Sequence, residues 1–251
     1  MPTSPAIGNA VHVSADEELR LGVSSCLLGE SVRYDGGHKR DDYVVDTLGA
    51  RFRLVPVCPE VEMGMSVPRE PVQLVRAHGT LRMIGRDSGT DHTDEMNRFA
   101  RQRANALRKL DLAGYVLKKG SPSCGMQGVQ VSTDEGKSSV LGVGLFARAL
   151  MEAIPLLPVE EEGRLADAVL RENFIVRVFA YHRLQTLFAG HWKVSELVAF
   201  HTREELLLTA HAASAYKKLG CIVADTRRLG REAVREQYSV GFMGALAEPA
   251  K

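Results

Sequence analysis

Three cysteines are the residues of this 251-residue chain whose positions could support metal chemistry. Cys26, Cys58 and Cys124 lie far apart in the sequence, and each follows an apolar run that is typical of a buried parallel strand. In open α/β sheets the ligand crevice lies outside the carboxyl ends of the strands. We therefore expect the three thiols to meet at one point and to form a metal or cluster site with one open position.

The chemistry of three thiols leaves several interpretations open. Thiolates select zinc or iron–sulfur clusters among the common metals. A closed zinc site usually takes two ligands from one tight knuckle, and the chain has no Cys-x-x-Cys pair. A 4Fe–4S cluster tolerates scattered ligands, and with three cysteines one iron stays open as a soft Lewis acid for a sulfur-bearing substrate. The remaining alternative is three unconnected buried cysteines, against which the small-residue loops around them argue.

Polar residues near these cysteines are candidates for catalysis and substrate binding. Glu60 stands two residues after Cys58 and can share its face, since alternate side chains of an extended segment point the same way. It is then a candidate base for activating water, although it could also be an ordinary surface glutamate. Ser121 either hydrogen-bonds a substrate or caps the loop before Cys124. We also expect substrate contacts near the strand ends, from Ser25, Tyr34, Asp35, Lys39 and Arg69, unless these residues only fix their loops.

The composition is that of an ordinary globular protein, with 45% hydrophobic and 25% charged residues. The net charge of +1 gives no global field that favours nucleic acid or a membrane, so any basic recognition surface is local. No apolar stretch approaches the roughly 18 residues that a membrane span needs. Four scattered cysteines without a secretory signal argue against a disulfide-stapled secreted domain. We expect a reducing cytoplasm and no obligate protein partner.

The hydrophobic pattern predicts an α/β domain over residues 19–158, with a mainly parallel sheet and flanking helices, after a disordered tail over residues 1–18. Strands are expected at 19–25, 52–57 and 114–117, and helices at 42–48, 91–110 and 144–154. A small hairpin is expected from 72–77 and 80–84, with His78-Gly79 as its turn.

Near residue 158 the sequence pattern changes from alternating strands and helices to successive helices. We interpret Glu160-Glu-Glu-Gly163 as a polar junction between the two parts. We expect a small all-helical domain over residues 159–251, with helices at 165–188 and 230–247. Thr202-Arg-Glu-Glu205 fits a capping box, with Leu206, Leu207 and Ala210 on the buried face that follows. Cys221 is expected to be a core residue of this domain.

A local excess of basic residues occurs in the helical segment. Residues 210–235 contain six basic and two acidic residues, which gives this segment a local net charge of +4. This pattern predicts either a stripe that contacts phosphates or a solvated helical surface.

Three separated motifs resemble those of the thiouracil desulfidase family, also labelled domain of unknown function 523. They are Ser25-Cys-Leu-Leu-Gly-Glu-Ser-Val-Arg-Tyr-Asp-Gly36, Val55-Pro-Val-Cys-Pro-Glu60 and Ser121-Pro-Ser-Cys-Gly125, within residues 19–158. The helical segment, with residues 198–211 and 216–220, is similar to the YbgA-like domain of unknown function 1722 that is usually fused to it. That domain generally runs longer, so we expect a shortened form here.

The resemblance implies a 4Fe–4S enzyme in which Cys26, Cys58 and Cys124 hold the cluster and leave one iron open. It implies that Glu60 activates a water that replaces the thiocarbonyl sulfur of a thiolated pyrimidine by oxygen, and that Ser121 assists. The fused form is similar to enzymes that remove sulfur from 4-thiouridine in tRNA. RNA contacts are then expected from the basic stripe, namely Lys217, Lys218, Arg227, Arg228 and Arg231. Free thiouracil is an alternative substrate, and a non-catalytic zinc or RNA-binding module is an alternative function.

Overall fold

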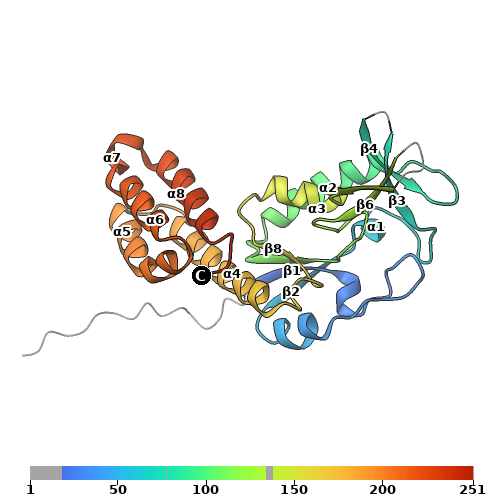
Figure 1. Ribbon diagram of the computed structural model, residues 1–251, viewed down its shortest axis with the longest axis horizontal. Helices are drawn as coiled ribbons and strands as arrows, with labels where there is room; N and C mark the ends of the chain where they lie inside the picture. Colours follow the sequence, from blue (N-terminus) through green and yellow to red (C-terminus); the bar gives the residue numbers. More distant parts are fainter. Residues whose placement is uncertain (1–18, 78, 134–137, 251) are drawn as a thin grey trace, which may run out of the picture.

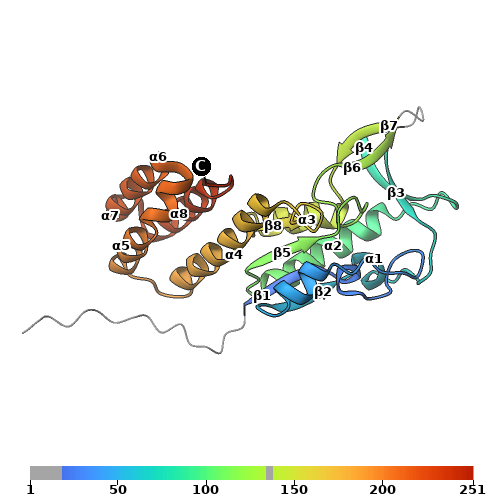
Figure 2. The ribbon, with the colours of Figure 1, turned by 60° about the horizontal axis from the view of Figure 1, so that its bottom comes forward.

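A computed structural model describes residues 19–77, 79–133 and 138–250 of the chain. An α/β lobe and a helical lobe lie at opposite ends of the long axis, and the long helix α4 (Ala168–Phe188) runs from one to the other (Figures 1 and 2). The tail expected over residues 1–18 lies outside the described residues. No described helix combines the length and the apolar character needed to cross a membrane.

The central sheet of the α/β lobe has four strands in the order β2-β1-β5-β8, and all three neighbouring pairs are parallel. The strands are β1 (Arg20–Ser24), β2 (Arg53–Val57), β5 (Gly114–Leu117) and β8 (Val159–Glu161). This confirms the expected α/β class with a mainly parallel sheet. The last strand runs past the expected boundary at residue 158, because Val159–Glu161 pairs with β5.

Helices cover both faces of this sheet, and each face has its own apolar core. On one face, α2 (Thr93–Arg108) and α3 (Leu145–Ala153) bury their apolar positions against Tyr115 and Leu117. On the other face, the π-helix η2 (Tyr43–Leu48) and the first part of α4 pack against Val23 and Val116. The three-four spacing of apolar residues in α2 produces its buried stripe, as the sequence predicts.

A second sheet of four strands packs beside the first, in the order β4-β3-β6-β7 (Figure 1). Its strands are β3 (Val72–Ala77), β4 (Thr80–Gly85), β6 (Val129–Thr133) and β7 (Ser138–Gly142). The β3–β4 hairpin was expected from the sequence, although His78 of its turn lies outside the described residues. The strands β6 and β7 were not expected, and β6 joins the hairpin by pairing in parallel with β3.

The helical lobe is built from α5 (Val194–Arg203), α6 (Glu205–Ala224), α7 (Thr226–Leu229) and α8 (Arg231–Ala245), together with the end of α4 (Figure 2). The expected capping box at Thr202 is wrong. Thr202 lies inside α5, where its hydroxyl donates to the carbonyl of Val198 four residues earlier. The chain breaks instead at Glu204, whose buried carboxylate is held by Arg183 of α4.

Two expectations about burial in this lobe are also wrong. Leu206 and Ala210, both expected on the buried face, are exposed, Leu206 by 84%, and the apolar contact of this turn is made by the fully buried Leu208. Cys221, expected in the core, is exposed. The helix α6 is interrupted at Ala212, whose φ of -154° and ψ of 88° are not helical, so the face set by its first turn does not continue to Cys221.

Candidate functional site

Three cysteines lie at the carboxyl ends of three neighbouring parallel strands. Cys26 lies in the short 3-10 helix η1 (Ser25–Leu28) directly after β1, Cys58 follows β2, and Cys124 lies in the loop after β5. Since β2, β1 and β5 are adjacent in the sheet, their ends bring the three side chains together. All three line one cavity of about 560 Å³, which is within the range of about 300–1,000 Å³ for ligand pockets.

The first two cysteines are fixed by local backbone structure. The carbonyl of Cys26 accepts the N–H of Lys39 at 2.9 Å, and Gly29 ends η1 with a φ of 91°, a conformation that glycine adopts without strain. Cys58 is the N-cap residue of the single-turn helix α1 (Pro59–Glu62). Its N–H donates to Oε1 of Glu62 at 3.0 Å, and its carbonyl accepts the N–H of Glu62 at 2.8 Å. The backbone of both cysteines is therefore fixed by hydrogen bonds.

The loop that carries Cys124 is fixed from both sides. The hydroxyl oxygen of Ser121 accepts the N–H groups of Ser123 at 3.2 Å and of Cys124 at 3.1 Å. After the cysteine, the N–H of Met126 donates to Oε1 of Glu161, at the end of β8, at 2.8 Å. Of the two roles open to Ser121, the structure shows the loop cap, and the residue also lines the cavity.

Burial and proximity act together on the three thiols. Burial, and after it the nearby Cys58, raise the pKa of Cys26 to about 11 against the opposing effects of Lys118 and Arg33. Burial also raises the pKa of Cys58, and it raises the pKa of Cys124 well above its usual value, with Glu60 and the other two cysteines adding to the shift. Thiols in such surroundings ionise when a bound cation compensates the negative charge.

The donor set fits a cluster better than a single ion. Among the described residues, no three His, Cys, Asp or Glu side chains are arranged to hold one metal ion. The thiolates of an iron–sulfur cluster bind separate iron atoms, so they need not converge on one point. Two buried thiols, Cys26 and Cys124, and the partly buried thiol of Cys58 around a cavity of this size match that requirement.

Glu60 of α1 lies beside the thiols in the same cavity and is held at both oxygens. Arg69 donates to Oε2 through Nε at 3.0 Å and through Nη2 at 2.5 Å. The hydroxyl of Ser123 donates to Oε1 at 2.7 Å. Ser123 was not expected at the site, although it is the second serine of the Ser-Pro-Ser-Cys motif.

The remaining predicted substrate contacts divide into two groups. Ser25, Tyr34 and Lys39 line the cavity, as does Arg69. Asp35 is not among the lining residues. Its Oδ1 accepts the N–H of Gly37 at 3.0 Å and pairs with Arg33, and these contacts lower the pKa of its carboxyl. Asp35 therefore fixes its own turn, as the alternative interpretation of these loops had it.

The lining of the cavity is strongly basic. Its charged members other than Glu60 are all cations, namely Arg33, Lys39, Arg69, Arg86, Lys118 and Lys119. Arg86 follows β4 of the second sheet and also lines the cavity. No sequence pattern had indicated it as a site residue. Lys118 is partly neutralised, because its Nζ bonds the carboxylate of Glu162. The cavity as a whole is suited to an anionic guest.

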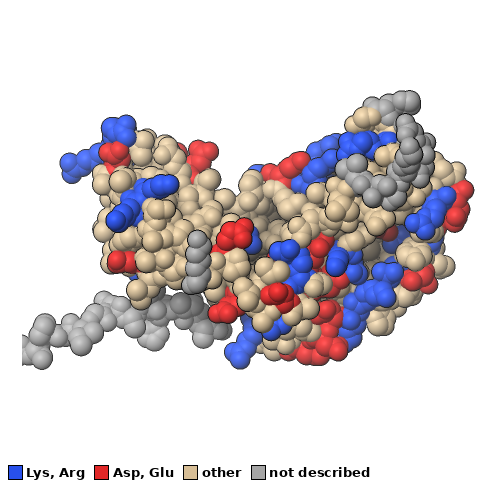
Figure 3. Space-filling view, in the orientation of Figure 1, with Lys and Arg blue, Asp and Glu red and all other residues tan. Residues whose placement is uncertain are grey.

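The basic residues expected to contact RNA lie in the other lobe. Lys217, Lys218, Arg227, Arg228 and Arg231 are all exposed on α6–α8. These helices occupy the opposite end of the molecule from the second sheet, two strands of which line the cavity (Figures 1 and 2). Figure 3 shows basic side chains over the α7 end of the helical lobe and, separately, over the α/β lobe. The structure therefore does not bring these residues to the cysteines.

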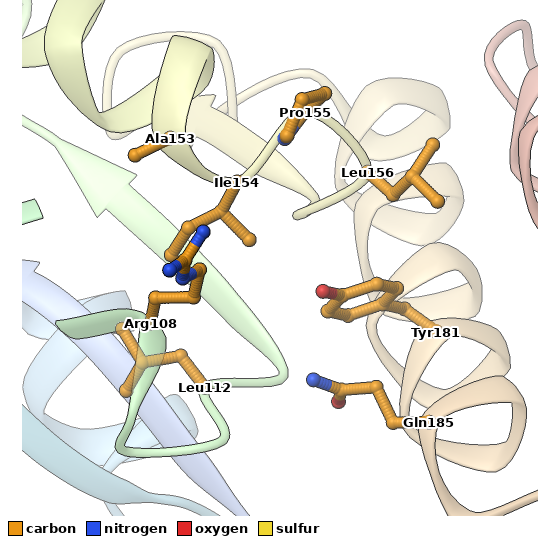
Figure 4. Close-up of a pocket in the computed structure, with 8 residues that line it drawn as sticks. All are labelled: Arg108, Leu112, Ala153, Ile154, Pro155, Leu156, Tyr181 and Gln185. Atoms are coloured by element: carbon orange, nitrogen blue, oxygen red, sulfur yellow. The ribbon is translucent and has the colours of Figure 1, made fainter. Parts of the chain in front are cut away.

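A second, smaller cavity of about 260 Å³ lies where the ends of α2 and α3 approach α4 (Figure 4). Tyr181 and Gln185 project into it from α4, toward Ile154 and Leu112. None of the four cysteines lines it, so it offers no comparable donor set.

Comparisons with known proteins agree with this geometry. The family model of 2-thiouracil desulfurase matches residues 21–162, more than half of the chain. The uncharacterized protein YbbK of Bacillus subtilis (strain 168) is 31% identical over 137 residues, which are 52% of this chain and 89% of YbbK. A solved structure described as the 4Fe–4S-dependent thiouracil desulfidase TudS is 33% identical, with a TM-score of 0.50 over 62% of this chain and 98% of its own. The chain thus belongs to the 2-thiouracil desulfurase family.

Proposed function

We propose that this protein is an iron–sulfur-dependent desulfidase that replaces sulfur by oxygen in a thiolated pyrimidine. The observation that carries the proposal is the meeting of Cys26, Cys58, Cys124 and Glu60 around one cavity. The three cysteines would hold a 4Fe–4S cluster with one iron left open. The match to TudS, a 4Fe–4S-dependent enzyme, supports that assignment. A reducing cytoplasm would keep these thiols free for the cluster.

The cluster, when bound, supplies an open iron that acts as a Lewis acid toward the sulfur of the substrate. The net reaction converts a thiocarbonyl and water into a carbonyl and hydrogen sulfide, without a change in oxidation state. Glu60 takes a proton from the water that attacks the ring carbon and returns it to the departing sulfur. Ser121 holds the loop of Cys124 and lines the cavity. Ser25, Tyr34 and Lys39 form the walls that receive the pyrimidine.

For the substrate we propose 4-thiouridine within tRNA. Two features support a phosphate-bearing substrate: the basic lining of the cavity and the exposed cations of α6–α8. The helical lobe would be the YbgA-like domain of unknown function 1722, placed to hold RNA outside the cavity. Free thiouracil is the second candidate, because the family description and TudS both refer to that base.

Anaerobic purification followed by activity assays tests the proposal. We expect a brown protein with near-stoichiometric iron and acid-labile sulfide, and hydrogen sulfide release from thiolated tRNA in excess of that from free 4-thiouracil. Serine substitutions at Cys26, Cys58 and Cys124 should each lose iron, whereas Cys221→Ser, at an exposed position in the other lobe, should keep it. A colourless protein with tightly held zinc and no sulfide release would instead support a non-catalytic binding module.

A further inference from the structure

We propose that Ser123 and Arg69 are positioning residues that clamp the Glu60 carboxylate from two sides and leave Oε1 as the oxygen that accepts the proton. This inference rests on the proposed function, because it assigns a geometry to the base of that reaction. Neither residue was expected to have this role, since Arg69 was expected to contact substrate and Ser123 was not singled out.

Arg69 forms the rigid side of the clamp. Its side chain is only 6% exposed, and both its Nε and its Nη2 donate to Oε2 of Glu60. Further bonds fix the guanidinium group itself, because Nη2 donates to the carbonyl of Val32 at 3.0 Å and Nη1 to that of Ser66 at 3.2 Å. A planar group held at this many points has little freedom to turn toward a substrate.

Ser123 forms the other side. It is fully buried, and its hydroxyl donates its one proton to Oε1 of Glu60 at 2.7 Å. Its backbone is anchored to the start of α3, since its carbonyl accepts the N–H groups of Phe146 at 3.0 Å and Ala147 at 3.1 Å. A Cβ atom at Gly144 would lie 2.5 Å from that carbonyl oxygen, so this close approach requires glycine. The position of the hydroxyl is therefore set by α3 and not by the loop alone.

Counting the acceptor positions identifies the reactive oxygen. A carboxylate oxygen offers about two lone-pair sites. Both sites of Oε2 are taken by Arg69, whereas Oε1 accepts one hydrogen bond from Ser123 and keeps one site. The proton from water is therefore taken at Oε1. The clamp also joins the three cysteine motifs, because Arg69 bonds Val32 of the first, Glu60 belongs to the second and Ser123 to the third.

A double-mutant cycle on holoenzyme tests the clamp. We expect Ser123→Ala to lower kcat by about 100-fold, the scale of loss when a catalytic group is misplaced by about 1 Å, with KM and iron content unchanged. Ser123→Thr, which keeps the hydroxyl, should recover most of this loss. In a Glu60→Ala background, Ser123→Ala should change the residual rate by less than about twofold, because residues that act as a unit are not additive. Arg69→Lys keeps the positive charge but loses the paired guanidinium donors. It should lower kcat with the same dependence on Glu60.

Controls separate the clamp from folding and from the proposed function. Ser239→Ala removes a buried hydroxyl in the helical lobe and should leave kcat unchanged. The clamp is overturned if Ser123→Ala keeps kcat within about twofold of the wild-type value at full iron content. It is also overturned if the fold-losses in kcat of Ser123→Ala and Glu60→Ala multiply fully in the double variant. If Ser123→Ala does not fold, the Arg69→Lys cycle with Glu60→Ala decides by the same criterion. Absence of sulfide release from the iron-loaded wild-type protein would instead overturn the proposed function.

Discussion

Glu161 accepts the backbone N–H of Met126 at 2.8 Å, two residues beyond Cys124. The carboxylate is almost fully buried and, among the described residues, forms no ion pair. It also lies within reach of the N–H of Gln127, at 3.5 Å. A buried carboxyl group is costly unless it is hydrogen-bonded, and here the bonds are supplied by backbone N–H groups of the loop after Cys124. The strand β8 therefore contributes to the cysteine site by closing the loop that carries Cys124.

The first prediction concerns this carboxylate. Glu161→Ala leaves the partly buried N–H of Met126 without its partner, so we expect the free energy of unfolding of the α/β lobe to fall by about 1–3 kcal/mol. Glu161→Gln keeps an acceptor oxygen, so its free energy of unfolding should fall by less than that of Glu161→Ala. Urea titration followed by circular dichroism measures both, and iron content should fall in the alanine variant alone. Equal stability of the two variants would show that the hydrogen bond does not hold the loop.

The position of Glu161 also shows where sequence reasoning reached its limit. The strands β1, β2 and β5 and the meeting of three cysteines followed from apolar runs and from the geometry of parallel sheets. The run Glu160-Glu-Glu162 was interpreted as a polar junction because its local composition is acidic. Its burial depends on pairing with β5 and on the loop after Cys124, and neither contact is encoded in the run itself.

Only the strands β3 and β4 of the second sheet were predicted, for a related reason. The hairpin of β3 and β4 has strong alternation and a glycine turn, which are local signals. The strand β6 reads Val-Gln-Val-Ser-Thr, too short and polar to stand out, and its partner β3 lies more than fifty residues earlier. A long-range parallel pair of this kind leaves no local pattern. Arg86 was missed as a cavity residue because this pairing places it there.

The second prediction concerns the break between α5 and α6. Arg183 donates to both oxygens of Glu204, through Nε at 2.8 Å and Nη2 at 2.7 Å, and the carboxylate is buried. Arg183→Met leaves this charge without its main partner, so we expect a loss of about 3 kcal/mol in the free energy of unfolding. Arg203→Met is the matched control. Its Nε lies 3.4 Å from Glu204 and its side chain is 54% exposed, so it should cost less than about 1 kcal/mol.

Fluorescence of Trp192 gives the measurement for Arg183→Met and Arg203→Met. Trp192 is the only tryptophan, is buried in the helical lobe and packs edge-on against Phe188. Its emission therefore reports unfolding of that lobe separately from the α/β lobe. Equal urea midpoints for the two variants would contradict a special role for the Arg183 pair.

The third prediction concerns pH. His201 stacks on Tyr216 with ring centroids 4.3 Å apart and shares a hydrogen bond with the hydroxyl of Tyr238. Burial lowers the pKa of His201 below its usual 6.5, against a smaller opposing effect of Glu205. The folded lobe thus binds this proton less readily than the unfolded chain does. Its stability should be constant above pH 6.5 and fall as the pH drops from 6.5 toward the folded pKa.

Trp192 emission in urea titrations between pH 8 and pH 5 measures this dependence. His201→Gln keeps a hydrogen-bonding group toward Tyr238 and does not titrate, so its urea midpoint should vary less with pH than that of the wild type. A wild-type midpoint that stays constant down to pH 5 would contradict the prediction.

The last prediction separates the two candidate substrates through the distance between the lobes. Among the described residues, Lys217, Lys218 and Arg227 take part in no ion pair, whereas Arg228 is partly neutralised by Asp225 and Arg231 lies over the ring of Trp192. Reversing the first three to glutamate should raise KM for thiolated tRNA and flatten its salt dependence by about one unit of slope per lost phosphate contact. It should leave KM for free 4-thiouracil unchanged, because these residues lie far from the cavity that receives the base.

The matched control makes the same charge change on the α/β lobe. Arg98, Arg101 and Lys109, on α2 and just beyond it, are exposed and do not line the cavity. Reversing them alters net charge equally, so any difference between the two triple variants reports position and not total charge. If both raise KM for tRNA by the same factor, the helical lobe has no specific role in holding RNA. The basic lining of the cavity would then be the recognition surface, and a small thiolated substrate would fit the structure better than tRNA.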